Sequence, residues 1–270
     1  FCWGSDVFPI LDFDLPGGQR ITLEVRRALA LGATGRDAEK VQRHIARMAE
    51  LGVKPPPHVP MLYPLMPTLV TNASDIGVIG TDSTPEVEAV LFTCQGAEYV
   101  TVGSDHTDRR IEAASSLHGK NSCPKVVGTR AWPLAEVREH WDALQLRASC
   151  GEILLQEGGV ANLLPITTLA EFVARHDGAQ SDGRLFFGGT VPVLGAPPKR
   201  GATITLELRD LALREREVER DCGAVRRGAP LPGPGLRPAD AVPRADTGDP
   251  DHRSGVRPRP PPCWRSASIG

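Results

Sequence analysis

Three acidic residues near the middle of the chain have the types and spacing of a cation site. Glu86 and Glu88 lie two residues apart in the segment Thr84–Phe92, which we expect to form a strand, so both carboxylates project from one face. Asp105 follows the next predicted strand, Glu98–Gly103, and pairing of the two strands would bring it toward the same point. Carboxylates this close repel one another unless a cation lies between them or one stays protonated. Such oxygen ligands suit Mg²⁺, Mn²⁺ or Ca²⁺.

The two glutamates also have a simpler interpretation. Glutamates that alternate along a strand are commonly found on a solvated face, and alone they indicate no ligand. Further motifs favour the cation site because they follow Glu86-Val87-Glu88 in a definite order. These are Gly103-Ser104-Asp105-His106-Thr107-Asp108, Cys123-Pro124-Lys125, Gln156-Glu157-Gly158, and Gly189-Thr190-Val191-Pro192 with Gly195.

This series resembles the C-terminal catalytic domain of the fumarylacetoacetate hydrolase superfamily, over about residues 20–218. The likeness is most specific to an uncharacterised bacterial branch of the superfamily. In that branch Gly103–Arg109, Cys123–Lys125 and the early Gly35-Arg36-Asp37 recur. The resemblance implies a β-rich α+β fold, described as a mixed β-sandwich roll, and a homodimer.

The resemblance also implies roles for individual residues. The three acidic residues would hold a divalent cation, Mg²⁺ or Mn²⁺, with Ca²⁺ as a further option. Lys125 would bind a substrate carboxylate or an oxyanion, and Lys120 is the substitute for that role. Gly189 and Thr190 would line the pocket at the acid end of the substrate.

Substrates in the superfamily are 2-oxo acids and acylpyruvates. A 2-oxo acid presents a carboxylate oxygen and a ketone oxygen to one cation, which stabilises the enolate formed when the adjacent C–C bond breaks. Our hypothesis is therefore a metal-dependent hydrolase or lyase that acts on a 2-oxo acid, an acylpyruvate or another 1,3-dicarbonyl by C–C hydrolysis or decarboxylation. The alternative is a non-catalytic protein that binds a small 2-oxo acid on the same fold.

Two departures from the superfamily pattern bear on the reaction. Characterised hydrolases carry a His and a Glu on a short N-terminal lid, but no His-x-x-Glu is present here: His44 is followed by Arg47, and His58 by Met61. His106 is a candidate replacement base, and a structural histidine is the equal alternative. Val191 separates Thr190 from the proline that usually follows directly. Hydrolase, decarboxylase and isomerase therefore remain open.

The apolar pattern predicts many short strands with few helices. One helix should run through Val41, Ile45, Met48 and Leu51 after a cap at Thr34 or Asp37. Asp108 and Arg109 are expected to pair or to cap a helix that begins near Thr107 and ends before Gly119. Further predicted elements are the helices Ala135–Leu144 and Leu169–Arg175, the latter capped by Thr168, and the strands Ile21–Val25, Ile153–Leu155, Val160–Leu164, Leu185–Phe187 and Thr203–Leu208.

Composition excludes several classes of protein. The 270 residues carry a net charge of −2, and a weakly acidic body argues against a nucleic-acid partner. No apolar run of about 18 residues is present, so we expect no membrane span. Six cysteines without a C-x-x-C pair suggest reduced thiols and a cytoplasmic location. Because the first residue is Phe1 rather than Met, we expect the natural N-terminus to lie upstream.

The end of the chain differs in kind from the rest. Residues 1–220 are expected to form a single catalytic-type domain, and residues 221–270 a tail rich in Arg, Pro and Gly. Too little apolar surface remains there to offset the ordering entropy, so we expect disorder. The tail also resembles a shifted reading frame of GC-rich DNA, which the nucleotide sequence would test. It appears where the superfamily has its last strand, so an unpaired sheet edge is predicted.

Overall fold

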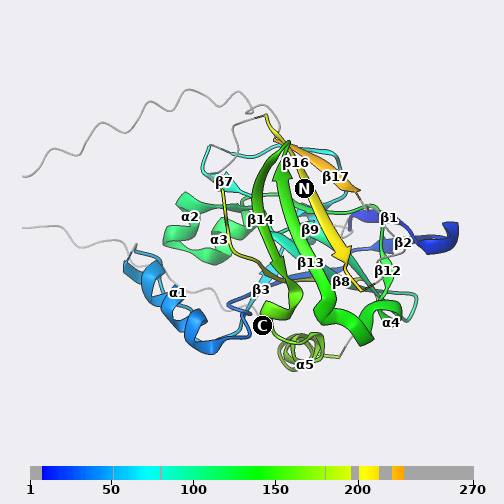
Figure 1. Ribbon diagram of the computed structural model, residues 1–270, viewed down its shortest axis with the longest axis horizontal. Coiled ribbons are helices and arrows are strands. Elements are labelled where there is room, and N and C mark those ends of the chain that lie inside the picture. The colour runs from blue at the N-terminus through cyan, green and yellow to red at the C-terminus, as the bar shows by residue number, and fades with distance from the viewer. Residues whose placement is uncertain are drawn as a thin grey trace, which may run out of the picture. The chain divides into compact units, whose positions relative to one another are not determined.

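Alternating apolar residues form many short strands in the described chain, and most of these strands belong to two large sheets (Figure 1). The computed structural model describes residues 8–50, 52–79, 81–179, 181–195 and 201–212, and the backbone of 221–227. The chain divides into the units Phe1–Pro232 and Gly233–Gly270, and all described residues belong to the first. The predicted β-rich α+β class is confirmed for this unit.

The larger sheet of the described residues is eight-stranded and mixed. Its order is β4-β3-β15-β8-β9-β11-β5, and β12 pairs with β9 beside this path. The strands are β3 (Arg27–Gly32), β4 (Met61–Leu65), β5 (Val70–Thr71), β8 (Val87–Cys94), β9 (Ala97–Ser104), β11 (Lys125–Val127), β12 (Trp132–Pro133) and β15 (Arg184–Thr190). The strands β8, β9 and β15 lie at its centre. β8 and β15 are buried along almost their whole length, and β9 is buried from Val100 to Ser104.

The second sheet has the order β14-β13-β16-β17-β6. Its strands are β6 (Asp75–Ile76), β13 (Leu144–Cys150), β14 (Ile153–Gly159), β16 (Thr203–Asp210) and β17 (Asp221–Arg227). The predicted unpaired edge is wrong, because β17 pairs antiparallel with β16 and parallel with β6. Residues 221–227, expected as the start of a disordered tail, are thus a strand, since backbone pairing on both sides offsets their polar composition. Residues 228–270 lie outside the described residues.

Short strands and helices complete the described unit. Two further pairs of strands are β1 (Ile10–Asp14) with β2 (Arg20–Glu24), and β7 (Ser83–Thr84) with β10 (Thr107–Asp108). The α-helices are α1 (Ala38–Glu50), α2 (Arg109–Ala114), α3 (Ser116–Asn121), α4 (Leu134–Val137) and α5 (Ile166–Asp177). Short 3₁₀ helices span Pro16–Gly18, Pro67–Leu69, Arg138–Ala143 and Val160–Asn162. No helix in the described part of the chain has the length and apolar character needed to cross a membrane.

Several element predictions need correction at their ends. The helix expected from Thr107 breaks at Ser115, whose side chain caps α3, so two short helices replace one. Thr168 lies inside α5 and does not cap it, because the helix already begins at Ile166 after Pro165. The segment predicted as the strand Val160–Leu164 begins with a 3₁₀ turn instead. Apolar spacing alone does not separate these alternatives in short segments.

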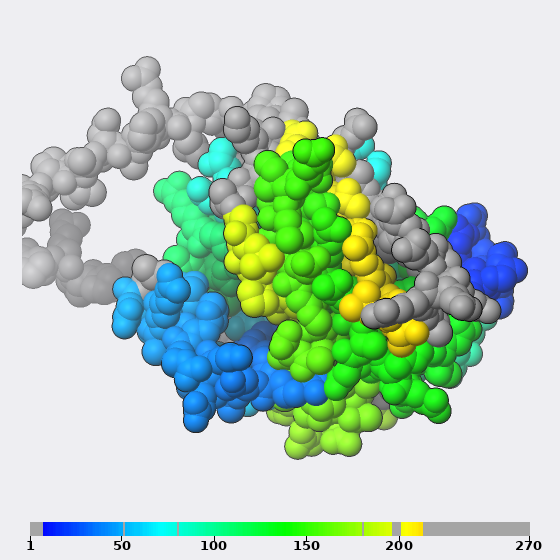
Figure 2. All heavy atoms as spheres, viewed as in Figure 1, coloured from blue at the N-terminus to red at the C-terminus, as the bar shows by residue number. Residues whose placement is uncertain are grey.

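The helix α1 forms where the sequence predicts it and lies at the surface of the described unit. Asp37 accepts a hydrogen bond from the Lys40 amide at 3.0 Å and caps the helix start. None of its described residues is fully buried, and Val41, Ile45 and Met48 are only half-buried. Figure 2 shows α1 at the edge of the visible face, beyond the two sheets.

The two faces of β8 belong to two different cores. Val87, Ala89 and Leu91 pack between the two large sheets with residues of β13, β16 and α5. The alternate residues Val90 and Phe92 pack on the other side, with residues of β1 and β2. In a strand that is buried on both faces, polar side chains can contact water only at the strand ends. The acidic residues at the start of β8 therefore require partners within the protein.

We predict that β17 stabilises the first unit by completing the second sheet. A chain that ends at Ala212 should melt at least about 4 °C below a chain that ends at Pro232, because β16 and β6 lose their shared neighbour. Calorimetry on both chains measures this difference. Equal melting temperatures would show that the β17 pairing contributes nothing to stability.

Candidate metal centre

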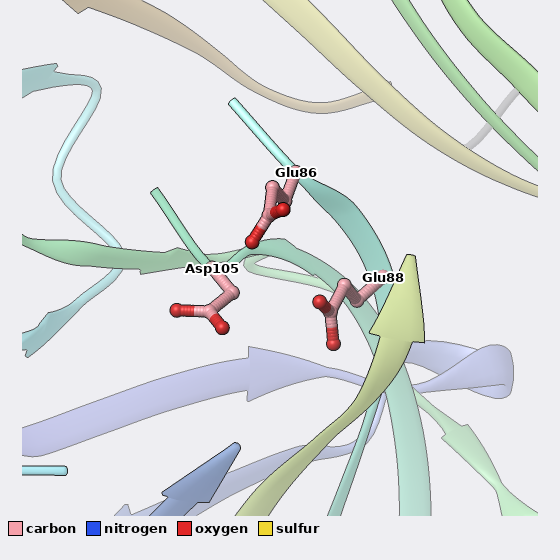
Figure 3. A group of neighbouring side chains, drawn as sticks. All are labelled: Glu86, Glu88 and Asp105. Carbon is pink, nitrogen blue, oxygen red and sulfur yellow. The ribbon is translucent and has the colours of Figure 1, made fainter. Parts of the chain in front are cut away.

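Three carboxylates converge where β8 begins and β9 ends. The β8–β9 hairpin turns at Gln95 and Gly96 as expected from the sequence, and its register pairs Val87 with Ser104. Asp105 therefore comes next to Glu86, and its amide donates to the Glu86 carbonyl oxygen at 3.0 Å. One oxygen from each of Glu86, Glu88 and Asp105 lies within 4.8 Å of the others (Figure 3). The structure thus brings together the three acidic residues singled out from the sequence.

These carboxylates are removed from water. Glu88 and Asp105 are 1% and 0% exposed, and the side chain of Glu86 is 12% exposed. The alternative of a solvated strand face is therefore wrong for this cluster. Buried carboxylates require countercharges or donors nearby.

Two lysines provide countercharges on Asp105. The Lys120 ammonium from α3 lies 2.5 Å from Asp105 Oδ2 and 3.2 Å from Glu86 Oε2. The Lys125 ammonium from β11 lies 2.7 Å from Asp105 Oδ1 and donates to the His106 carbonyl oxygen at 2.5 Å. The β9–β11 register explains the second contact, because Val126 opposite Ser104 brings Lys125 beside Asp105. Each Asp105 oxygen therefore faces an ammonium group.

The two lysines differ in their surroundings. Lys125 is fully buried between Asp105 and the His106 carbonyl oxygen. The side chain of Lys120 is 7% exposed, and its ammonium lies 5.6 Å from the centre of the Tyr63 ring. Lys120 is thus the less deeply buried of the two lysines.

Arg109 supplies a third positive charge, on the other side of Glu86. Its guanidinium lies 2.9 Å from Glu86 Oε1 and 2.6 Å from Glu112 Oε2. Asp108 caps α2 by accepting a hydrogen bond from the Ile111 amide at 2.9 Å, as expected. The sequence reasoning missed the contact between Arg109 and Glu86, although Arg109 ends the Gly103–Arg109 motif.

The charges act on the two glutamates in opposite directions. Burial alone would raise the pKa of Glu86. The positive charges of Lys120 and Arg109 outweigh this effect and lower the pKa to about 2. Burial and the neighbouring Asp105 raise the pKa of Glu88 well above its ordinary value. Burial lowers the pKa of Lys120, but Asp105 and Glu86 outweigh it and raise that pKa. Glu86 is therefore ionised at neutral pH, and Glu88 is the glutamate that more readily holds a proton.

Gly189 and Thr190, expected to line the pocket, hold the start of β8. The Gly189 amide donates to Glu88 Oε2 at 2.7 Å. The Thr190 hydroxyl donates to the Val87 carbonyl oxygen at 2.9 Å and accepts from Gln156 Nε2 at 3.0 Å. The Gln156 side-chain oxygen accepts from the Val87 amide at 2.9 Å. The Gln-x-Gly hairpin and the late glycine motif thus fix the strand that carries the glutamates.

A missed neighbour of this site is Thr34. Gly189 has φ +104°, and a Cβ added there would lie 1.8 Å from Thr34 Oγ1. Thr34 is buried and follows Ala33, which has φ 56°. Only glycine fits position 189, because both the backbone conformation and the space exclude a side chain.

His106, the candidate base, is fully buried directly after Asp105. Its carbonyl oxygen accepts the hydrogen bond from Lys125. Its role as a base stays a prediction, as do the roles of the other site residues.

The residues fit a hard divalent cation. Adjacent oxygens around an octahedral Mg²⁺ lie about 3 Å apart and opposite ones about 4.2 Å. Three carboxylate oxygens within 4.8 Å need only a modest inward movement to reach such spacing. Carboxylate oxygens without sulfur or imidazole ligands favour Mg²⁺, Mn²⁺ or Ca²⁺.

The profile of the family described as "Protein of unknown function (DUF2848)" matches residues 31–219. The chain belongs to this family. Comparison with curated protein sequences gives no significant match.

In fold, this DUF2848 chain is similar to proteins of the fumarylacetoacetate hydrolase family. A fumarylpyruvate hydrolase from Pseudomonas aeruginosa, solved with Mn²⁺ and pyruvate, has a TM-score of 0.58 at 16% identity over 84% of this chain and 98% of that chain. A provisionally assigned fumarylpyruvate hydrolase from Burkholderia cenocepacia gives 0.59 at 14% identity, over 86% and 96%. A fumarylacetoacetate hydrolase family protein of yeast gives 0.52 at 12% identity, over 77% and 96%. The family profile confirms membership of an uncharacterised family, and these structures confirm the resemblance to the superfamily in fold.

We predict that the two glutamates respond differently to neutral replacement. With a chelator present at pH 7, Glu86→Gln should destabilise the protein by about 3 kcal/mol, because Lys120 and Arg109 lose their countercharge. Glu88→Gln should cost less than about 1 kcal/mol, because glutamine resembles the protonated acid. Denaturant unfolding of both variants measures these differences. Equal losses would contradict the assigned charge states.

The effect of Glu86→Gln should also depend on pH. Because the pKa of Glu86 falls from 4.5 to about 2 on folding, its carboxylate contributes stability above pH 4.5. That contribution is lost as the pH drops toward 2, so the difference from the wild type should shrink over this range. A difference that stays constant down to pH 3 would show that the pKa is not lowered.

Gly189→Ala should destabilise the chain by about 1–3 kcal/mol, because the alanine requires an unfavourable φ and collides with Thr34. Gly77→Ala is the matched control, since nothing lies within 4 Å of its added Cβ. Thermal melting of both variants provides the comparison. A Gly189→Ala protein as stable as Gly77→Ala would contradict the close packing.

Proposed function

We propose that this protein is a metal-dependent enzyme that cleaves a C–C bond in a 2-oxo acid, an acylpyruvate or another 1,3-dicarbonyl, by hydrolysis or decarboxylation. The observation that carries the proposal is the convergence of three buried carboxylates at adjoining strand ends. The fold shared with a hydrolase solved with Mn²⁺ and pyruvate supports the choice of substrate class.

The three carboxylates are the proposed cation ligands. Glu86 and Glu88 approach from the start of β8 and Asp105 from the end of β9, so one hairpin sets the spacing. A bound Mg²⁺ or Mn²⁺ would polarise the ketone oxygen of the substrate and stabilise negative charge there. Ca²⁺ has the same preference for oxygen ligands and remains an option.

Lys120 is the proposed partner of the substrate carboxylate. Its ammonium lies at the cluster on a side chain that is 7% exposed, whereas Lys125 is fully buried and contacts Asp105 and the His106 carbonyl oxygen. We therefore assign Lys125 the role of positioning Asp105, in place of the substrate contact expected from the sequence. A cation in a water-poor site orients an anionic substrate more strongly than one in water.

The remaining proposed roles are to line the pocket and to accept a proton during the reaction. Gly189 and Thr190 bound the site beside Glu88 and support the acid end of the substrate. His106 is the proposed base, and full burial means that it acts on a molecule enclosed with it. A cytoplasmic homodimer completes the proposal.

The test is cation binding and turnover by the full chain. The wild type should bind Mn²⁺ and release pyruvate from an acylpyruvate, and Glu86→Gln/Glu88→Gln should lose both. Glu112→Gln is the matched control, because Glu112 contacts Arg109 outside the cluster. Calorimetry measures binding, and a coupled pyruvate assay measures turnover.

The outcomes separate the hypotheses. Equal Mn²⁺ content in the wild type and the double variant would reject the proposal. Binding of pyruvate or oxalate that depends on Mn²⁺, without turnover of any acylpyruvate, would favour the non-catalytic binding protein.

A further inference from the structure

The Lys120 ammonium lies among the carboxylates that would attract a divalent cation. Its ammonium contacts two of the three candidate ligands, at 2.5 Å from Asp105 Oδ2 and 3.2 Å from Glu86 Oε2. Oxygens of these residues and of Glu88 cluster within 4.8 Å. A second cation next to the ammonium would be strongly repelled at such distances in a buried site.

Among the positive charges at the cluster, Lys120 is the one that a divalent cation could replace, because Asp105 and Glu86 each have another positive partner. Lys125 is fully buried and holds Asp105 through the opposite oxygen, so Asp105 keeps a countercharge when Lys120 moves. Arg109 likewise holds Glu86 through Oε1, the oxygen that Lys120 does not contact. Both carboxylates are therefore held in position independently of Lys120.

Lys120 has a second environment within reach. Its ammonium lies 5.6 Å from the centre of the Tyr63 ring, and an aromatic face stabilises a displaced cation. The side chain starts from α3, which is six residues long and is capped at Ser115. An ammonium that moves away from Asp105 toward the Tyr63 ring would keep a favourable partner.

We propose that the Lys120 ammonium competes with the divalent cation for Glu86 and Asp105, so that cation binding displaces Lys120 from at least one of them. This inference rests on the proposed function, since it concerns the same carboxylates. It has a further consequence: an anionic group that recruits Lys120 strengthens cation binding, and the cation strengthens binding of the anion equally.

The experiment is Mn²⁺ titration of the chelator-treated full chain by calorimetry. Lys120→Met should bind Mn²⁺ at least about tenfold more tightly than the wild type, because the competing charge is gone. Lys120→Gln should show the same direction. Arg110→Met is the matched control, because it removes an exposed positive charge next to Arg109, and it should leave the affinity close to that of the wild type. Circular dichroism identifies any variant that does not fold.

Each result decides the matter. Tighter binding by either folded Lys120 variant, including binding seen only in the variant, supports the competition. Unchanged or weaker binding by a folded variant, with clear binding by the wild type, overturns it and leaves the proposed metal site intact. Loss of folding in both variants also overturns it, because Lys120 would then be a structural countercharge rather than an exchangeable one. If neither the wild type nor the folded variants bind Mn²⁺, the proposed function fails as well.

Discussion

Burial of like charges in a small volume is the constraint on which the described structure depends. Glu86, Glu88 and Asp105 lie at the ends of strands that are covered on both faces, so water cannot solvate them fully. Repulsion among them must be offset by cations or by protonation. Lys120, Lys125 and Arg109 approach from α3, β11 and α2, three elements that follow β9 in the chain. The segment after the hairpin thus supplies the countercharges for the hairpin itself.

The rest of the fold keeps this arrangement in place. The β8–β9 register determines which carboxylates meet, and β15 adds the Gly189 amide that binds Glu88. Gln156, from the second sheet, binds the backbone of Val87 and so joins the two sheets at the site. An error of one residue in either register would turn the carboxylates away from one another. The precision of the site is therefore a property of strand pairing more than of the individual side chains.

Local patterns predicted the geometry at the centre of the site, and the order of the later motifs was needed to favour a cation site there. The period of two along β8 placed Glu86 and Glu88 on one face, and the turn at Gln95 and Gly96 predicted the pairing that brings Asp105 near. Both inferences depend on short separations in sequence, where geometry is strongly restricted. The same reasoning predicted the cap at Asp108.

Contacts between distant segments were harder to predict. From the sequence, the substrate contact was expected of Lys125, with Lys120 as the substitute. Our proposal reverses this order, because it depends on how deeply each side chain is buried beside Asp105. The contact of Thr34 with Gly189 depends on a turn about 155 residues away, whose position only the packed sheet defines. The strand β17 was missed because its polar composition hides backbone pairing with β16 and β6.

The central claim is that three carboxylates hold one hard cation, and anomalous X-ray diffraction from crystals soaked in Mn²⁺ tests it most directly. The account predicts one strong manganese peak within bonding distance of Glu86, Glu88 and Asp105, with Lys120 moved from its present contacts. Strong peaks that lie only elsewhere, or none at this cluster at saturating Mn²⁺, would contradict it.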